Sequence, residues 1–449
     1  MNFSSFIWAI PFLGIIFSVS LMPLLAPKIW HRWGGFAPAF WTVIYLLGVG
    51  YEFGATNIPS AMLDPLLEHY TPFMALIAAL YITSGGIFIE FPGRRGAVFN
   101  VCFLLGGSII AGWMGTTGAA MLLIRPFLRA NASRKYKTHL LVFFIFLVAN
   151  IGGAITPLGD PPLFIGFLEG VDFFWFAKNI GGIWLAAIVI LCSLFFIIDT
   201  VMFRREHVEG SSSVGDGDGD DVDDGCGGGG GFLLLGRRNL PLLAGILAAV
   251  TLCNFPGTFE VGGYKFSSCE WTRSLLLAVI AVVSLKVTPE NIRQKNCFAL
   301  GPLQEVAGLF AGIFITVVPI IQMLHLGPSG EFQPIFDWIA PRGEFAASRC
   351  FWASGLLSAF LDNAPTFLIF FHLISGNAAE LMTSKAPLLT AISISTVFMG
   401  ALTYIGNAPN LMVKSVWEAH QAPTPSFMGY LVWSIGILVP LFYLISLWL

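Results

Sequence analysis

A seven-residue pattern built from Thr, Gly, an acid or amide, and Pro occurs twice in the chain. The first copy runs from Thr156 to Pro162 and the second from Thr403 to Pro409, 247 residues later. Each copy interrupts an apolar stretch, where Gly and Pro break the helical hydrogen-bond ladder and free backbone carbonyl and amide groups. Two such breaks in two halves of a membrane chain predict the binding site of a transporter.

Further oxygen-bearing side chains stand near these breaks and complete a set suited to a hard cation. Carboxylate, amide, hydroxyl and carbonyl oxygens are the ligands that such an ion prefers. We predict Na⁺ at Asp160, Asp362 and Asn363, no catalytic residues and no resident cofactor, with Na⁺ and H⁺ as transported or coupling ions. The predicted cation- or substrate-binding residues are Thr116, Thr117, Asn150, Thr156, Gly159, Asp160, Asp362, Asn363, Thr403, Gly406, Asn407 and Asn410.

A simpler role is open to both carboxylates. Asp is a preferred helix N-cap, and both Asp160 and Asp362 precede a predicted helix. Capping and ion binding are compatible, because both use the same oxygen-rich helix end.

The composition indicates a membrane protein. Of 449 residues, 56% are hydrophobic and 11% are charged, whereas soluble domains carry roughly 25% charged residues. The mean hydropathy of +0.79 agrees. The seven cysteines form no C-x-x-C pair, so we expect small buried apolar residues rather than a disulfide framework or a zinc motif. The expected partners are the lipid bilayer and a small inorganic cation or a carboxylate, and we expect no nucleic acid.

Ten segments are apolar enough to span a membrane, which takes about 20 residues. The segment nearest the N-terminus has no basic region before it, so we expect a retained helix rather than a cleaved signal. Two further apolar segments, 97–128 and 347–377, do not resemble single spans. The predicted spans are 6–25, 36–51, 72–91, 139–168, 173–200, 239–255, 271–287, 303–325, 387–417 and 427–449.

The distribution of Lys and Arg predicts the topology. Most of the 23 basic residues fall on the cytoplasmic side if the N-terminus lies outside. Basic residues then flank segment 97–128 on both sides, so this segment must enter and leave from the cytoplasm as a re-entrant hairpin. The same reasoning makes 347–377 a hairpin on the outer side. We therefore expect a multi-pass protein of the inner (plasma) membrane.

Each half contains five crossings and one hairpin, and an odd number of crossings makes the second half start from the opposite side. The sequence thus predicts an all-α membrane protein of inverted repeats, with about 10 spanning helices, two re-entrant hairpins and two helices broken at mid-membrane. The first repeat covers 1–200, with the broken helix at 139–168. The second covers 239–449, with the broken helix at 387–417.

The segment 201–238 between the repeats is rich in Gly and Asp. Such a composition cannot bury a core, so we predict a flexible cytoplasmic linker. Its alternation of Asp and Gly is similar to a calcium loop, but Asp221 and Gly227 occupy the positions where that loop requires Gly and Glu.

Four charged or titratable residues lie near these elements, and two of them, Arg125 and Glu305, have two possible roles each. Arg125 could hold an anion or pair with a carboxylate, or it could extend to the cytoplasm along its apolar stem. Glu305 begins a span and could be interfacial or functional. His139 and His372 flank the two hairpins and are expected at the membrane interface.

Five motifs in order resemble the NhaD-like sodium/proton antiporter branch of the ion transporter superfamily, which is also catalogued with citrate transport. The resemblance covers both halves and leaves out only the linker. It implies an inverted-repeat fold, a homodimer, and a transport domain of hairpins and broken helices that moves against a scaffold. The motifs are Gly112 to Thr117, Leu122 to Pro126, Asn150 to Pro162, Leu361 to Thr366, and Gly406 to Asn410.

The chain departs from the dicarboxylate branch of that superfamily, which is similar but carries Ser-Asn-Thr at both hairpin tips. Here the tips are Gly115-Thr116-Thr117 and Asp362-Asn363-Ala364. A negative Asp362 disfavours a carboxylate substrate and favours a cation. We therefore predict a secondary active sodium/proton antiporter that works by alternating access, in which Na⁺ and H⁺ compete for the same oxygens. The alternative is a cation-coupled carrier of citrate or another carboxylate; an enzyme and a channel fit the motifs less well.

Overall fold

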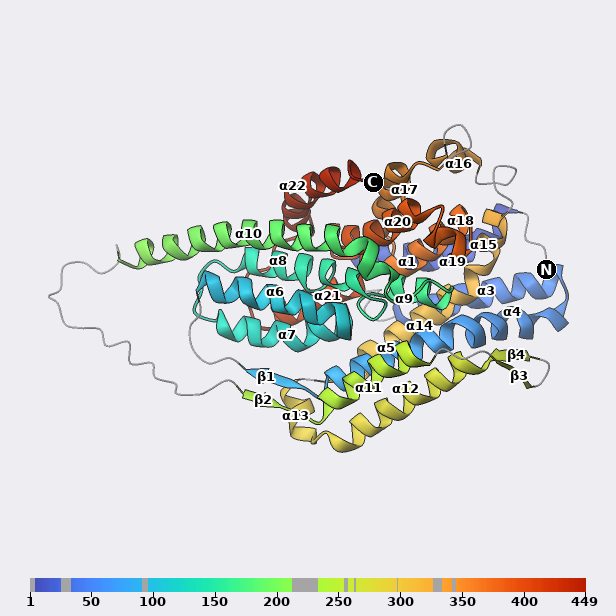
Figure 1. Ribbon diagram of the computed structural model, residues 1–449, viewed down its shortest axis with the longest axis horizontal. Helices are drawn as coiled ribbons and strands as arrows, with labels where there is room; N and C mark the ends of the chain where they lie inside the picture. Colours follow the sequence, from blue (N-terminus) through green and yellow to red (C-terminus); the bar gives the residue numbers. More distant parts are fainter. Residues whose placement is uncertain are drawn as a thin grey trace.

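The computed structural model is mostly helical, at 79%, and its described residues include two short two-stranded sheets (Figure 1). The Gly/Asp-rich segment 212–232 lies outside the described residues. The structure describes residues 5–25, 34–90, 96–211, 233–253, 257–261, 264–296, 298–325, 333–340 and 345–449.

The elements follow one another in two series, before and after the linker. The first series is η1 (Phe6–Ala9), α1 (Ile10–Leu25), η2 (Gly34–Phe36), α3 (Ala37–Glu52), η3 (Ala55–Asn57), α4 (Ile58–Pro65), η4 (Leu66–Tyr70), α5 (Thr71–Ser84), β1 (Phe88–Glu90), α6 (Ala97–Met114), α7 (Thr116–Ala130), α8 (Thr138–Leu147), η5 (Ile151–Ile155), α9 (Pro161–Leu168) and α10 (Trp175–Ser211). The second series is β2 (Leu233–Leu235), α11 (Asn239–Leu252), β3 (Thr258–Val261), β4 (Tyr264–Ser267), α12 (Ser268–Val287), α13 (Glu290–Lys295), α14 (Gly301–Thr316), α15 (Val318–His325), α16 (Gln333–Ile339), α17 (Ala347–Ser358), α18 (Asn363–Ile374), α19 (Ala378–Met382), α20 (Ala386–Met399), η8 (Gly400–Leu402), α21 (Ala408–Ala419) and α22 (Phe427–Ser446).

Seven helical segments of the described residues are long and apolar enough to cross a membrane, and the chain is a multi-pass integral membrane protein. The ten predicted spans are thus not ten long helices, because several are shorter apolar helices or are interrupted. The seven are Ala55–Ser84, Ala97–Met114, Thr138–Ile155, Trp175–Glu206, Ser268–Val287, Leu303–Met323 and Phe427–Ser446.

The predicted span 72–91 has different bounds in the structure. The helical segment begins upstream at Ala55 and ends at Ser84, where Gly85 and Gly86 follow. The amide of Asn296 donates to the Gly85 carbonyl at 3.0 Å. The chain then forms β1, which pairs antiparallel with β2, Phe88 opposite Leu235. The helix ends early because distant backbone and side-chain partners take up the polar groups after Ser84.

Secondary structure occupies both ends of the interval predicted as a linker. Helix α10 continues to Ser211, and β2 begins at Leu233. The pairing of β2 with β1 places the end of the linker beside the end of α5. Figure 1 shows these strands near the start of α11, at the end of the molecule from which the linker extends.

The first predicted hairpin consists of α6 and α7, which lie side by side and are joined by Gly115 (Figure 1). Gly115 has a φ of +86°, which L side chains rarely adopt, so glycine suits this turn. The second consists of α17 and α18, where Asp362 is the N-cap and accepts a hydrogen bond from the Ala364 amide at 3.4 Å. The two turns therefore differ: one has no side chain and the other carries a carboxylate.

A helix break occurs at each copy of the duplicated motif. In the first, α8 gives way to η5 and a turn before α9 begins at Pro161. In the second, α20 gives way to η8 before α21 begins at Ala408. Asp160 and Asn407 are the N-cap residues of α9 and α21, and both have extended backbone angles.

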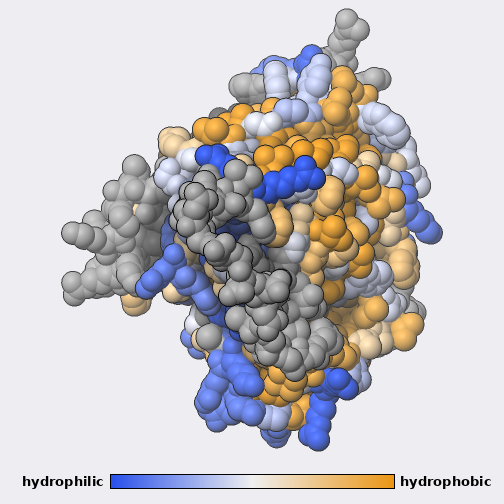
Figure 2. Space-filling view, turned by 90° about the vertical axis from the view of Figure 1, so that its left-hand side faces the viewer, coloured by the Kyte–Doolittle hydropathy of each residue, from blue (hydrophilic) through white to orange (hydrophobic). Residues whose placement is uncertain are grey.

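Large apolar side chains are exposed along α3, α10, α12 and α22. Leu47 on α3, Ile197 on α10, Leu275 on α12 and Val432 on α22 are each at least 60% exposed. In the face that Figure 2 shows, hydrophobic residues cover a broad area and hydrophilic residues lie mainly along its margins. This exposed apolar surface suits contact with lipid tails.

Candidate functional site

Asp160 is the centre of a buried polar cluster. Its Oδ1 accepts a hydrogen bond from the Thr116 hydroxyl at 2.7 Å, and its Oδ2 accepts one from the Asn363 amide at 2.8 Å. These donors stand at the starts of α7 and α18, so one carboxylate joins the two hairpin turns. Although Asp160 is the N-cap residue of α9, its side chain makes no capping hydrogen bond. The Asp160 side chain therefore does not cap α9.

Asp362 and Asp160 line the same cavity, which has a volume of about 70 Å³. Thr116, Thr117 and Asn407 also line it, together with apolar residues of α5 and α14. Among the described residues, no ion pair joins either carboxylate to a Lys, Arg or His. The cavity thus contains two carboxylates and neutral polar groups.

The Thr residues of the two motifs make equivalent contacts at the 247-residue offset. The Thr156 hydroxyl donates to the Gly112 carbonyl, and the Thr403 hydroxyl donates to the Ala359 carbonyl, each at 2.5 Å. Each hydroxyl also accepts a hydrogen bond at 3.2 Å from the amide two residues later. The two Thr side chains thus connect each helix break to its neighbouring hairpin.

Three amides join the two broken helices to one another. Asn150 donates to Asn410 at 2.7 Å, and Asn407 donates to Asn150 at 3.1 Å. Asn410 also donates to the Thr403 and Gly400 carbonyls at 2.9 Å. The predicted amides therefore form a second cluster that holds the two breaks together, and of the three only Asn407 lines the cavity.

Close backbone approach explains the predicted glycines. A Cβ on Gly159 would lie 2.1 Å from the Gly153 carbonyl oxygen, and one on Gly406 would lie 2.6 Å from the Gly400 carbonyl oxygen. The Gly159 carbonyl accepts the Thr116 amide at 2.8 Å. Both glycines allow the chain to fold back on itself within the break.

A smaller cavity adjoins the site cavity, and Tyr81 and Gly118 line both. Arg125 lines the smaller cavity with Ser84 and Asn296. The guanidinium of Arg125 donates to the Met121 carbonyl at 3.4 Å. Arg125 therefore lies beside the site without bonding to Asp160 or Asp362. Glu305 is exposed on α14 and lines neither cavity.

Similarity to one protein family extends over almost the whole chain. The family described as "Putative citrate transport" matches residues 2–449. The chain belongs to this family. A protein of the cyanobacterium Synechocystis, named as an uncharacterized transporter, is 25% identical to this citrate transport family member over 183 residues. The match covers 38% of this chain and 28% of the relative.

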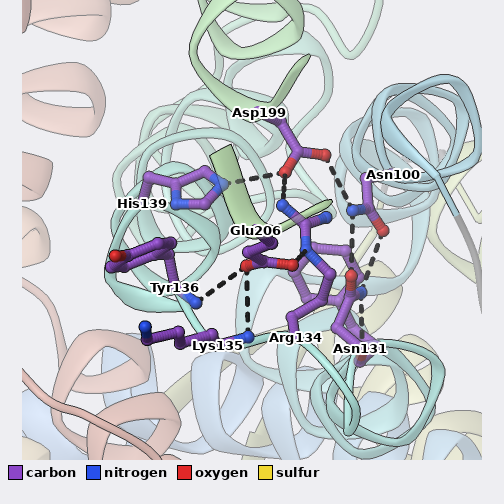
Figure 3. A network of polar contacts seen from close by, with 9 residues as sticks. Asn100, Asn131, Arg134, Lys135, Tyr136, His139, Asp199 and Glu206 are labelled. Atoms are coloured by element: carbon purple, nitrogen blue, oxygen red, sulfur yellow. Dashed lines mark hydrogen bonds and ion pairs between the residues drawn. The ribbon is translucent and has the colours of Figure 1, made fainter. Parts of the chain in front are cut away.

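This citrate transport family member also has a second buried polar network, which the sequence did not predict (Figure 3). Asp199 on α10 accepts hydrogen bonds from Arg134 at 2.7 Å, from Asn100 at 2.9 Å and contacts His139 Nε2 at 2.9 Å. Arg134 also pairs with Glu206 at 3.0 Å. His139 is 2% exposed, so its ring is enclosed by the protein and faces Asp199 rather than lipid or water.

The network of Figure 3 connects the open end of the first hairpin to α10. Asn100 on α6 and Asn131, the C-cap of α7, exchange two amide hydrogen bonds of 2.9 Å. Because Asn100 also binds Asp199, both ends of the hairpin are held against α10. A sequence signal existed: Asp199 is an acid inside a long apolar helix.

One residue beside the site was also missed. The Ser358 hydroxyl donates to the Asn363 side-chain oxygen at 2.9 Å, which leaves the amide nitrogen of Asn363 directed at Asp160. Ser358 therefore positions the group that binds Asp160. Its signal was weak, because small polar residues also serve close helix packing.

Proposed function

We propose that this citrate transport family member is a secondary active transporter that exchanges Na⁺ for H⁺ at Asp160, Asp362 and Asn363. The observation that carries the proposal is the surroundings of Asp160: a buried carboxylate bonded to Thr116 and Asn363, both neutral. An ionised carboxylate in such a place is costly unless a cation or a proton neutralises it. Na⁺ and H⁺ both do so, and they compete for the same oxygens.

Competition and alternating access together produce exchange. When Na⁺ occupies the carboxylates, protons leave, and when protons bind, Na⁺ is released. The matched contacts of Thr156 and Thr403 at one offset support an inverted repeat, in which two equivalent halves expose the site alternately to each side. Most Lys and Arg residues fall in segments on the same side of the membrane as the linker, which supports a cytoplasmic linker and an N-terminus on the outer side.

Everted membrane vesicles provide the test. Wild-type protein is expected to collapse a preformed pH gradient when Na⁺ is added, and Asp362→Asn is expected to abolish this response. Glu305→Gln removes an exposed carboxylate of α14 and should leave the response unchanged. If Asp362→Asn also leaves it unchanged, the proposal is wrong.

A second candidate function rests on Arg125 and on the family description. Arg125 lines a cavity that shares walls with the site cavity, and a guanidinium suits a carboxylate substrate. In this alternative the protein is a carrier of citrate or another carboxylate, with Na⁺ or H⁺ as the coupling ion.

Radiolabelled citrate uptake with and without Na⁺ discriminates between the two functions. Na⁺-dependent uptake that falls at least about tenfold in Arg125→Gln, the loss expected for one charged hydrogen bond, would favour the carboxylate carrier. Absence of uptake, with Na⁺/H⁺ exchange intact in Arg125→Gln, would favour the antiporter.

A further inference from the structure

A third cavity, with a volume of about 520 Å³, lies at the opposite end of α5 from β1. Glu68 and His69, just before α5, line it together with Asp64 of α4, Glu169 at the end of α9 and His372 of α18. Glu169 Oε1 lies 3.6 Å from His372 Nε2. No Lys or Arg is among its described lining residues. We name this cavity the acidic vestibule.

Four phenylalanines lie between the acidic vestibule and the site cavity. Phe73, Phe164 and Phe310 line the site cavity, and Phe314 lines the vestibule. The Phe73 ring centroid lies 4.6 Å from that of Phe310, 5.4 Å from that of Phe314 and 6.3 Å from that of Phe164. All four side chains are buried, with at most 3% exposure. The rings therefore form a continuous apolar barrier.

The four phenylalanines come from two groups of helices, α5 and α14 on one side and α9 on the other. Phe73 belongs to α5, and Phe310 and Phe314 belong to α14, which packs against it. Phe164 belongs to α9, the helix that begins just after Asp160. A displacement of α9 relative to α5 and α14 would therefore part Phe164 from the other rings while it carries Asp160 along.

We propose that these four phenylalanines are the gate between the cation site and the acidic vestibule, and that the vestibule is the passage by which cations reach the site from that side. This inference rests on the proposed function. A cluster of packed apolar side chains excludes water and hydrated ions, and the carboxylates beyond it raise the local concentration of cations. In the described structure the gate is closed, while the site cavity adjoins the Arg125 cavity at the opposite end of α5.

Chemical labelling in membrane vesicles of both orientations tests the gate. Met412 on α21 lines the site cavity, and Met412→Cys is introduced into full-length protein whose seven native cysteines are replaced by Ser or Ala. A membrane-impermeant methanethiosulfonate is then added from either side. We expect Phe73→Ala and Phe310→Ala to raise the labelling rate from the vestibule side by about tenfold or more, since opening the apolar barrier admits water.

The matched control is Phe143→Ala, which removes a fully buried phenylalanine of α8 that does not line either cavity. Its labelling rate from the vestibule side should equal that of the parent. Phe73→Leu keeps apolar bulk and should give an intermediate rate, which covers the case in which an Ala variant does not fold.

Equal rates from the vestibule side in the parent, both Ala variants and Phe73→Leu would overturn the gate. Labelling requires neither Na⁺ nor a pH gradient, so its outcome is independent of the exchange assay. If Asp362→Asn retains exchange, the proposed function fails, whereas the labelling result still decides whether the barrier closes the site.

Discussion

Two buried aspartates of the first half have opposite surroundings. Asp199 contacts Arg134, His139 and Asn100, so a permanent positive charge compensates it (Figure 3). Asp160 accepts hydrogen bonds from Thr116 and Asn363, which are neutral. Both side chains are at most 2% exposed.

The difference distinguishes a carboxylate with a structural role from the carboxylate that we propose binds a cation. Burying a charge costs free energy unless an opposite charge and hydrogen bonds accompany it. Asp199 has both in the folded chain, so its role is complete without an added ion. Within the described ranges Asp160 has hydrogen bonds but no positively charged partner, so in the proposed function a cation or a proton supplies the positive charge.

The largest expected effect is on stability, and it tests the structural role of Asp199. Asp199→Asn leaves Arg134 without its closest charged partner, so the free energy of unfolding should fall by about 3–5 kcal/mol. Loss of folded protein on heating in detergent, followed by gel filtration, measures it. The triple variant Arg134→Met, Asp199→Asn and Glu206→Gln should recover part of the loss, because all three charges of the network are then removed together. Unchanged thermal stability of Asp199→Asn would contradict the structural assignment.

Asp160→Asn should lower the rate of exchange without lowering the stability of the fold. We expect exchange to fall about 10- to 100-fold, because contacts to a charged ligand contribute about 1.5–3 kcal/mol and each 1.4 kcal/mol is a factor of ten. Thermal stability should stay equal or rise, since the variant removes an uncompensated buried charge. The pH-gradient assay and the heating assay are run on the same preparations. A loss of stability as large as that of Asp199→Asn would erase the distinction between the two residues.

The apparent affinity for Na⁺ should depend on pH. Protons compete for the carboxylate oxygens, so affinity should fall as pH falls, by up to about tenfold per pH unit for one competing proton. Half-saturating Na⁺ for exchange at several pH values measures the slope. Asp172→Asn, an exposed carboxylate outside the site cavity, should keep the slope. A pH-independent affinity in the wild type would rule out direct competition.

The smallest expected effect concerns the neutral donor on α7. Thr116→Ala removes one hydrogen bond to Asp160, so half-saturating Na⁺ should change by about 2- to 10-fold. Thr116→Ser retains the hydroxyl and should behave like the wild type. Equal changes in both variants would mean that packing of the Thr methyl, rather than the hydroxyl, matters.

Local chemistry made part of this arrangement predictable. Gly and Pro within an apolar segment break a helix whatever its tertiary contacts, so both helix breaks could be predicted from the duplicated motif. The helix bounds after Ser84 were not predictable, because they depend on Asn296 and on strand β2, both far along the chain. Similarly, the position of His139 beside the first hairpin did not predict its contact with Asp199, which lies 60 residues away in the chain.

The sequence by itself determined the class of protein, the two helix breaks and the set of oxygen-bearing residues around them, since composition and helix-breaking residues act locally. Only the tertiary structure decided which carboxylate is compensated. Asn363 reaches Asp160 across 203 residues, and Arg134 reaches Asp199 across 65. Compensation of a buried charge depends on neighbours in space, so the difference between Asp160 and Asp199 exists only once the chain is folded.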